Sequence, residues 1–330
     1  MNPQTIAAVA RILPPSVREN EPMSKHTTLR VGGNARFFYP ADDLETLAAV
    51  LPALYHAQIP YLFVGHGSNL LMSDAGYDGV VIQNRCKGTR IEATGEVYAE
   101  CGASLGSLFA QTQRAGLAGL EWGIGIPGTV GGALVSNAGA YRGNIGPLVQ
   151  TVRAFYEGAV GEFGREWLGF SYRDSRLRNE TPPRTVVLSV EMMLSPASDP
   201  AEVMAKAKQY QAERRAKQPL QPSAGSFFKN VQNRELAERF DDLAPALKDA
   251  GVVPTGFLSM KAGCMGWCEG GAMVSDKHGN FLVNAGNATA TDFRRLADRV
   301  KERILSEYGV LLEEEVLAVG DWGATLPTII

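Results

Sequence analysis

The sequence lacks the features that mark membrane, secreted and nucleic-acid-binding proteins. No apolar run approaches the roughly 18 residues that a membrane-spanning helix requires. The N-terminal segment MNPQTIAAVARILPP has neither the basic start nor the long apolar core of a signal peptide. A net charge of −3 gives no overall attraction to nucleic acid or to an anionic membrane. We therefore expect a cytoplasmic protein without a nucleic-acid or membrane partner.

Cysteine is also scarce, with only Cys86, Cys101, Cys264 and Cys268 in the chain. The last two have the spacing of half a metal site, but the other two are distant in sequence. The four histidines show no paired ligand spacing either. These patterns favour reduced structural thiols and predict no metal.

The composition is that of an ordinary globular protein, with 45% hydrophobic and 20% charged residues among 330. Such a length suffices for two or three domains. Asp42, followed three residues later by Glu45, predicts the start of a helix through a capping box. Pro219–Gln221 predicts a domain boundary because it breaks a long helical pattern. Apolar periodicity predicts helices over 5–13, 42–57, 104–115, 200–218, 236–250 and 292–308, and strands over 36–39, 61–64, 80–83, 96–100, 149–156, 184–194, 272–275, 281–284 and 311–319.

The most informative stretch is GIGIPGTVGGALVSNAGAY, residues 123–141, which has six glycines and no charge. Without Cβ atoms, its backbone N–H groups can approach a ligand closely. It has no lysine, so it is not the phosphate loop of a mononucleotide enzyme. Gly123, Gly125 and Gly128 spell G-x-G-x-x-G, but the flanking strand and helix of a Rossmann fold are missing. A large ligand such as a dinucleotide fits this stretch better.

Two further glycine-containing segments precede it. Thr27–Ala35 places a Gly-Gly pair beside Arg30, a pattern equally typical of a phosphate-binding loop and of a plain turn. Gly65–Leu71 follows a predicted strand and offers backbone and side-chain donors to a ligand.

Seven segments form a recognisable set that covers nearly the whole chain: TTLRVGGNA (27–35), GHGSNLL (65–71), GIPGTVGGALVSNAGAY (125–141), YRDS (172–175), AGSFFKN (224–230), SDKHGNFLVN (275–284) and LEEEV (312–316). Together, and in this order, they resemble the UDP-N-acetylenolpyruvoylglucosamine reductase family of peptidoglycan synthesis. The segment 194–202 is too short for the inserted loop of the longer subclass, so the chain resembles the compact subclass and no lid tyrosine is expected.

The resemblance implies an α+β fold with an FAD-binding module of two subdomains, of the vanillyl-alcohol oxidase type. The subdomains would be residues 1–84, with a closing strand at 311–320, and residues 85–220. A C-terminal α+β substrate-binding domain would cover residues 221–310. The resemblance also implies a monomer that acts in cell-wall biogenesis, and hence in cell shape and cell division.

The implied reaction uses FAD, NADPH and UDP-N-acetylglucosamine enolpyruvate. Hydride passes from NADPH to the flavin, and from flavin N5 to the methylene carbon of the enol ether. The product is UDP-N-acetylmuramate. The FAD contacts implied are Arg30, Gly32, Gly33, Gly65, His66, Gly67, Ser68, Asn69, Leu70, Gly125, Ile126, Pro127, Gly128, Thr129, Gly131, Gly132 and Ala133. The substrate contacts implied are Tyr141, Arg173, Lys229, Asn230, Ser275, His278 and Asn284.

Three residues match the catalytic positions of the family. Arg173 would grip the substrate carboxylate and the negative charge that develops beside it. Ser226 would supply the final proton. Glu315 would act as a protonated carboxyl, which requires a desolvated group with a raised pKa. In a strand Glu313 and Glu315 share a face, so only the family pattern selects Glu315.

Without the resemblance, the same residues have ordinary structural interpretations. Serine in Ala-Gly-Ser is typical of a turn, and Arg173 beside Asp174 is typical of a surface salt bridge. The basic end of helix 200–218 is more typical of a solvated face than of a group that lends positive potential to a cleft. Its basic residues are Lys206, Lys208, Arg214, Arg215 and Lys217. Leu317, Val231 and the segment 267–269 depart from the family pattern. Two functional alternatives are another FAD oxidoreductase on the same module and a non-catalytic sugar-nucleotide sensor.

Overall fold

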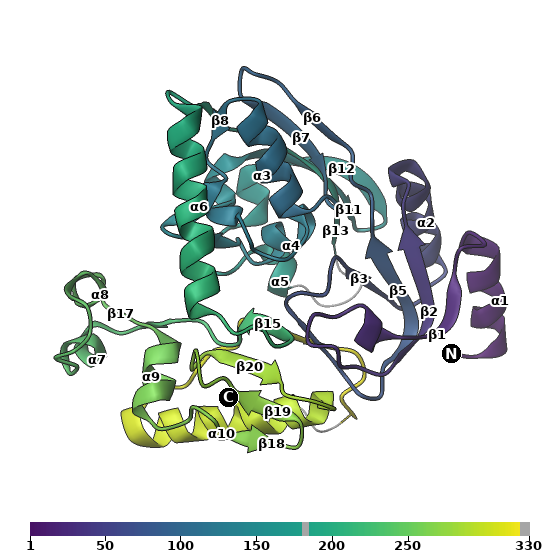
Figure 1. Cartoon of the computed structure of the whole chain (residues 1–330). Helices are drawn as coiled ribbons and strands as arrows, with labels where there is room; N and C mark the ends of the chain where they lie inside the picture. The colour runs from purple at the N-terminus through teal and green to yellow at the C-terminus, as the bar shows by residue number, and fades with distance from the viewer. Residues whose placement is uncertain (180–184, 324–330) are drawn as a thin grey trace. The chain divides into compact units, whose positions relative to one another are not determined.

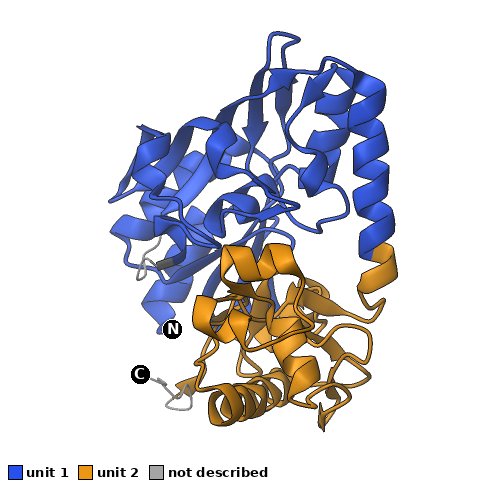
Figure 2. Ribbon diagram, turned by 90° about the vertical axis from the view of Figure 1, so that its left-hand side faces the viewer, with its two compact units in different colours: residues 1–21, 35–67, 77–214 blue, residues 22–34, 68–76, 215–330 orange. Residues whose placement is uncertain are grey.

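The computed structural model describes residues 1–179 and 185–323 (Figure 1). The chain forms two compact units, shown in different colours in Figure 2. Unit 1 contains residues 1–21, 35–67 and 77–214, and unit 2 contains residues 22–34, 68–76 and 215–330. The predicted α+β fold is confirmed, whereas the three-part division at 84/85 and 220/221 stays a prediction.

The first sheet has four strands in the order β1-β2-β5-β3 and is centred in unit 1. Strand β5 is parallel to both β2 and β3, and buried residues of α1 and α2 belong to the same apolar core. The elements are α1 (Pro3–Ile12), β1 (Arg18–Pro22), β2 (Asn34–Ala41), α2 (Leu44–His56), β3 (Tyr61–Val64) and β5 (Tyr77–Asn84).

The second sheet of unit 1 is antiparallel, in the order β12-β11-β13-β7-β6. Its apolar side chains share a core with α3, α4 and α6. The strands are β6 (Thr89–Ile91), β7 (Glu96–Glu100), β11 (Val149–Tyr156), β12 (Ala159–Gly164) and β13 (Val186–Met193). The helices and short pairs are α3 (Leu105–Arg114), α4 (Val130–Val135), α5 (Arg176–Asn179), α6 (Pro200–Lys217), β8 (Leu117–Ala118) with β14 (Ser195–Pro196), and β9 (Gly139–Ala140) with β10 (Gly143–Asn144).

Unit 2 is built on an antiparallel sheet in the order β15-β20-β19-β18, with α10 packed along it (Figure 1). Its main elements are β15 (Ser223–Ser226), β18 (Cys268–Glu269), β19 (Ala272–Val274), β20 (Phe281–Asn284) and α10 (Ala290–Tyr308). The others are β4 (Leu70–Met72), parallel to β21 (Leu317–Val319), β16 (Val231–Gln232), paired with β17 (Val252–Val253), α7 (Arg234–Glu238), α8 (Pro245–Ala250) and α9 (Thr255–Lys261). Four 3₁₀ turns complete the description: η1 (Met23–Lys25), η2 (Glu121–Gly123), η3 (Gly146–Leu148) and η4 (Arg165–Leu168).

Several predicted boundaries are wrong for local reasons. The N-cap of α2 is Asp43 rather than Asp42, because the Asp43 carboxylate accepts from Thr46 N at 2.8 Å. The predicted helix 236–250 is two helices, and Pro245 begins the second. The predicted strand 311–319 is a strand only over its last three residues. Residue 184 of the predicted strand 184–194 lies outside the described residues.

A buried ionic cluster in unit 2 involves the predicted strand segment and α10. Arg294 of α10 is 8% exposed and donates to Glu314 at 2.8 Å and to Asp298 at 2.9 Å. Lys301 also pairs with Glu314. Burial raises the pKa of Glu314, but the hydrogen bonds and charges of Arg294 and Lys301 outweigh burial and lower it overall. Glu314 therefore binds α10 as a carboxylate and is not a solvated surface group.

Replacing Glu314 should destabilise the protein in a pH-dependent way. We expect Glu314→Gln to reduce the free energy of unfolding at pH 7 by about 3 kcal/mol, because it leaves Arg294 buried without its full counter-charge. Since the folded-state pKa is lowered, the wild-type advantage is present above the unfolded pKa of about 4.3 and is lost as the pH falls through the folded pKa. Urea unfolding at several pH values measures this difference. The exposed Glu302→Gln on the same helix should change stability little, and an equal effect of both variants would contradict the assignment.

Candidate active site

The glycine stretch of unit 1 is fixed to the end of β7 by its own backbone. Val130 N donates to Ala103 O at 2.8 Å, and Gly131 N donates to Cys101 O at 2.9 Å. Thr129 caps α4, because its hydroxyl accepts from Gly132 N at 3.1 Å. These bonds hold the stretch against the second sheet with little freedom.

The loop that follows β3 packs directly on this stretch. A Cβ atom on Gly65 would lie 2.4 Å from Thr129 Oγ1, so only glycine fits there. Gln83 Nε2 also donates to Gly65 O at 3.2 Å. The structure thus brings together two segments that were predicted to contact FAD from positions some sixty residues apart in sequence.

The backbone of these two loops suits a phosphate-bearing cofactor. Gly125, Pro127 and Gly132 are exposed. Among the residues that the structure describes, none accepts a hydrogen bond from the N–H groups of His66, Gly67, Gly125, Gly128 or Thr129. Backbone donors without partners on adjacent glycine-containing loops are what an anionic dinucleotide requires. The residues present therefore fit FAD.

The remaining predicted cofactor residues belong to unit 2, where the Gly-Gly pair has a packing role. A Cβ atom would lie 2.7 Å from the Met72 side chain at Gly32 and 2.1 Å from Asp74 O at Gly33. Arg30 is exposed, with a left-handed φ of 57°. Close packing thus explains the glycines of this segment, and its contact with FAD stays a prediction. The same holds for Ser68, Asn69 and Leu70.

Arg173 lies in a short turn attached to the end of the glycine stretch. Its Nη2 donates to Gly139 O at 2.6 Å, and its backbone is left-handed, with φ 53°. Asn137 Nδ2 donates to Ser171 O at 2.8 Å, while Asn137 Oδ1 accepts from Gly146 N at 3.0 Å. Asn137 therefore connects the turn to the stretch and to the segment that leads into β11.

Ser226 and Glu315 are neighbours along the backbone of unit 2. Glu315 N donates to Phe227 O at 2.8 Å, and Lys229 N donates to Glu313 O at 2.8 Å, so the two segments run antiparallel. Asn69 Nδ2 donates to Glu315 O at 3.0 Å. The structure thus joins the segments that carry the predicted proton donor and the predicted acid.

The two other glutamates of this segment have structural partners. Glu313 pairs with Lys229, which is 7% exposed, and Glu314 pairs with Arg294. Residues 311–316 form no strand, so the argument that Glu313 and Glu315 share one face of a strand is wrong.

Buried Asn280 fixes the Ser226 segment from the other side. Its Nδ2 donates to Phe228 O at 2.8 Å, and its Oδ1 accepts from Phe228 N at 3.0 Å. His278 packs edge-on against Phe281, with ring centroids 4.8 Å apart, and burial lowers the pKa of His278. Its Nδ1 accepts from Asn280 N at 3.2 Å, which leaves Nε2 for other contacts.

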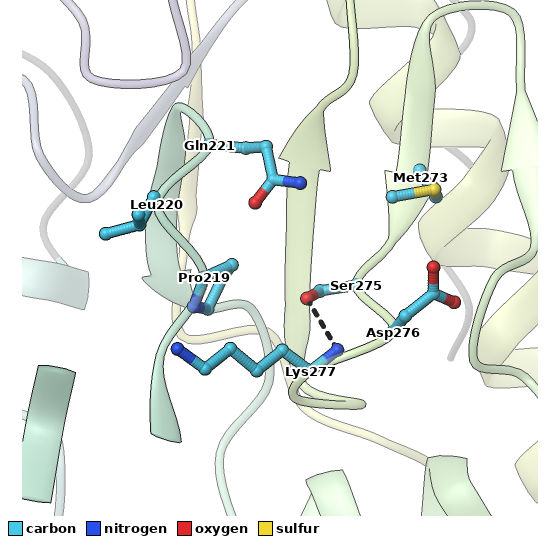
Figure 3. A pocket seen from close by; sticks show the side chains of 7 residues that line it. All are labelled: Pro219, Leu220, Gln221, Met273, Ser275, Asp276 and Lys277. Carbon is cyan, nitrogen blue, oxygen red and sulfur yellow. Dashed lines mark hydrogen bonds between the residues drawn. The ribbon is translucent and has the colours of Figure 1, made fainter. Parts of the chain in front are cut away.

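The remaining predicted substrate residues divide between structural and accessible positions. Asn284 Nδ2 donates to Leu29 O at 3.0 Å, and Asn230 Oδ1 accepts from Thr255 N at 3.3 Å, so both brace the backbone. Ser275 lines a pocket of about 500 Å³ with residues of the α6–β15 connection (Figure 3). Its hydroxyl accepts from Lys277 N at 3.1 Å. Tyr141 belongs to unit 1 and is 37% exposed.

Sequence reasoning missed the supporting residues of this site. Asn137 and Asn280 lie inside the quoted segments, but nothing in the pattern shows that their side chains bridge backbone groups. The prediction of a solvated helix face is wrong for Arg214, because its Nε is buried. Only the contacts made in the folded chain reveal these roles.

No described helix combines the length and the apolarity needed to cross a membrane. Within residues 1–179 and 185–323, no three His, Cys, Asp or Glu side chains are grouped so as to hold a metal ion. Cys264 and Cys268 are separate thiols, the first buried and the second exposed.

Comparison with known proteins covers both units. Residues 35–156 match the family model "FAD binding domain", and residues 217–319 match "UDP-N-acetylenolpyruvoylglucosamine reductase, C-terminal domain". The chain is 37% identical to the reductase of that name from Geobacter metallireducens, over 97% of this chain and 100% of the relative. It is also 37% identical to that from Carboxydothermus hydrogenoformans, over 91% and 94%. The crystal structure of the Thermus caldophilus reductase matches with a TM-score of 0.72 at 32% identity, over 92% of this chain and 99% of that one.

Removing the Asn137 side chain should destabilise unit 1. We expect Asn137→Ala to cost about 2–3 kcal/mol of unfolding free energy, because it leaves the buried Gly146 N–H group without a partner and removes the bond to Ser171 O. The matched control is Asn287→Ala, since Asn287 has a similar left-handed φ of 53° but is exposed. The control should cost at most about 1 kcal/mol, through backbone strain alone. Denaturant unfolding compares the two, and equal losses would contradict the bridging role.

Proposed function

The chain belongs to the UDP-N-acetylenolpyruvoylglucosamine reductase family, and from this premise we propose that it reduces UDP-N-acetylglucosamine enolpyruvate to UDP-N-acetylmuramate, with NADPH as the hydride donor. The observation that carries the proposal is the similarity to a reductase along 97% of this chain and the full length of the relative. The setting is peptidoglycan synthesis in the cytoplasm, with effects on cell shape and cell division, and the working form is a monomer.

FAD, when bound, supplies the redox group through which a hydride from NADPH reaches the methylene carbon of the enol ether. The residues proposed to hold it are those of the two adjacent loops, Gly65–Gly67 and Gly125–Ala133. Their free backbone N–H groups suit its phosphates, and Gly65 permits the close packing of the loops.

Arg173 is proposed to bind the carboxylate of the enolpyruvyl group. As hydride adds to the methylene carbon, the electron pair of the double bond moves toward the neighbouring carbon and its carboxylate. A guanidinium that is already oriented stabilises this charge, by about 3 kcal/mol in comparable sites. The bond to Gly139 O and the bridge made by Asn137 orient Arg173 before the substrate arrives.

Ser226 is proposed to donate the proton that completes the reaction. Its hydroxyl proton passes to the carbon that carries the negative charge, and solvent then restores the hydroxyl. Hydrogen bonds at Phe227 and Phe228, the two residues that follow, hold its backbone in place. A Glu315 that stays protonated would donate a hydrogen bond to the carboxylate of the intermediate.

The residues proposed to bind the sugar nucleotide are Lys229, Asn230, Ser275, His278 and Asn284 of unit 2, and Tyr141 and Arg173 of unit 1. Of these, Ser275 lines the open pocket in Figure 3, where polar and apolar side chains are mixed.

The reaction separates into two steps that can be observed in one anaerobic experiment. NADPH should abolish the flavin absorbance of the purified protein, and the enolpyruvyl substrate should restore it. A protein that holds no flavin, or whose reduced flavin does not respond to the substrate, would contradict the proposed function.

Ser226→Ala should block only the second of these steps. We expect flavin reduction within twofold of wild type and reoxidation by the substrate slowed about 10²–10⁴-fold, because the proton donor is missing. Stopped-flow absorbance measures both rates. Ser223→Ala, on the same strand, is the matched control and should leave both rates unchanged. Equal reoxidation by the two variants would remove Ser226 from the mechanism.

Substitution of Glu315 tests whether a neutral donor is needed there. If Glu315 acts while protonated, Glu315→Gln keeps a donor and should lose far less reoxidation rate than Glu315→Ala. The alanine variant should lose about 10²–10³-fold, as for other removed donors. A glutamine variant as slow as the alanine variant would instead indicate that the carboxyl group itself is required.

A further inference from the structure

Arg214, near the end of α6, lies over the start of the glycine stretch. Its guanidinium lies 5.4 Å from the centre of the Tyr141 ring, and its Nη2 donates to Trp122 O at 3.1 Å. A Cβ atom on Gly125 would lie 3.6 Å from Arg214 Cδ, so the side chain passes close to that exposed glycine. All these contacts lie within unit 1.

The aromatic partner of Arg214 is itself held in place. Tyr141 stacks on Tyr210, with ring centroids 3.8 Å apart and planes 4° from parallel. Its hydroxyl donates to Tyr210 O at 3.2 Å. Tyr210 lies one helical turn before Arg214 on α6, so the arginine and the ring below it are positioned by the same helix.

The guanidinium of Arg214 is only partly satisfied by the described residues. Its Nε is buried and has no hydrogen-bond partner. No carboxylate among the described residues forms an ion pair with it. Burial lowers the pKa of Arg214, the Tyr141 hydroxyl opposes this shift, and the charge of Arg173 adds to it. Burying part of a cation that has no carboxylate partner is unfavourable unless something supplies negative charge.

We propose that Arg214 is an anion-binding residue, and that phosphate or carboxylate oxygens of a bound substrate accept hydrogen bonds from its guanidinium group. The inference rests on the proposed function, because that function supplies the anions. A guanidinium is suited to this task, since its donors match the oxygens of either group.

Three sources of this anion are available in the proposed reaction: the diphosphate of the sugar nucleotide, its enolpyruvyl carboxylate and the phosphates of the nicotinamide dinucleotide. UDP-N-acetylglucosamine offers the first alone, the full substrate offers the first two, and NADP⁺ offers the third. Titrating the oxidised flavoprotein with each ligand and following the flavin spectrum measures affinity without turnover.

The variants are Arg214→Met, which keeps the apolar stem, Arg214→Lys, which keeps the charge, and Arg215→Met as the control. Arg215 is the next residue on the helix and is exposed. We expect Arg214→Met to weaken at least one of the three ligands about tenfold or more relative to Arg215→Met. Arg214→Lys should recover part of that loss. The ligands that are weakened identify the source: the full substrate alone indicates the carboxylate, both sugar nucleotides indicate the diphosphate, and NADP⁺ indicates the dinucleotide.

Two results would overturn the proposal. One is that Arg214→Met binds all three ligands within twofold of the control. The other is that its weaker binding accompanies a lower melting temperature or loss of flavin and is not improved in Arg214→Lys, because that pattern indicates a structural role. Failure of the proposed function is separate, since a wild-type protein that does not turn over the substrate still reports its affinities in the titrations.

Discussion

The contact between Gly65 and Thr129 is the constraint on which the candidate site of unit 1 depends. It allows the loop after β3 to pack against the N-terminus of α4, where Thr129 also caps the helix. Any larger residue at position 65 would separate the two loops, and their backbone donors would no longer converge. Arg173 is attached to the far end of the same stretch, so its orientation follows from the same packing. A site for a large anionic cofactor is thus formed from backbone geometry before any side-chain charge is considered.

In unit 2, as in unit 1, hydrogen bonds to the backbone hold the proposed catalytic residues in place. Ser226 lies at the end of a strand, and the residues after it are bound by Asn280 on one side and by the Glu315 segment on the other. In both units a buried asparagine therefore makes paired bonds to the backbone next to a proposed catalytic residue. Amide side chains suit this role because they donate and accept at once without adding charge. Each unit thus holds its proposed catalytic residue in place without an added charge.

The sequence predicts the regular elements well where one local pattern controls them. The strands 61–64 and 149–156 have the predicted bounds, because their apolar runs are short and clearly interrupted. The prediction fails where a competing hydrogen bond sets the start of a helix, as at the Asp43 cap. It also fails where tertiary contacts take the place of the hydrogen bonds between strands, as over 311–316. The family resemblance identifies the segments of the site, but it does not show which side chains hold those segments in place. Arg214 belongs to a basic helical run that looks solvated, and only its position over Tyr141 and Gly125 shows that it is partly buried.

The two clusters of buried charge in this chain show how stability and function place different demands on ionic groups. Arg294 is nearly inaccessible, but two carboxylates balance it, so the protein alone satisfies its hydrogen bonds. Arg214 is less buried, yet its Nε has no partner and no carboxylate among the described residues pairs with it. Selection for stability would be expected to remove the second arrangement, because an apolar residue of the same length would avoid the desolvation cost. The desolvation cost of Arg214 is understandable if an anionic substrate offsets it. The free energy recovered when the anion binds then adds to the affinity for that substrate.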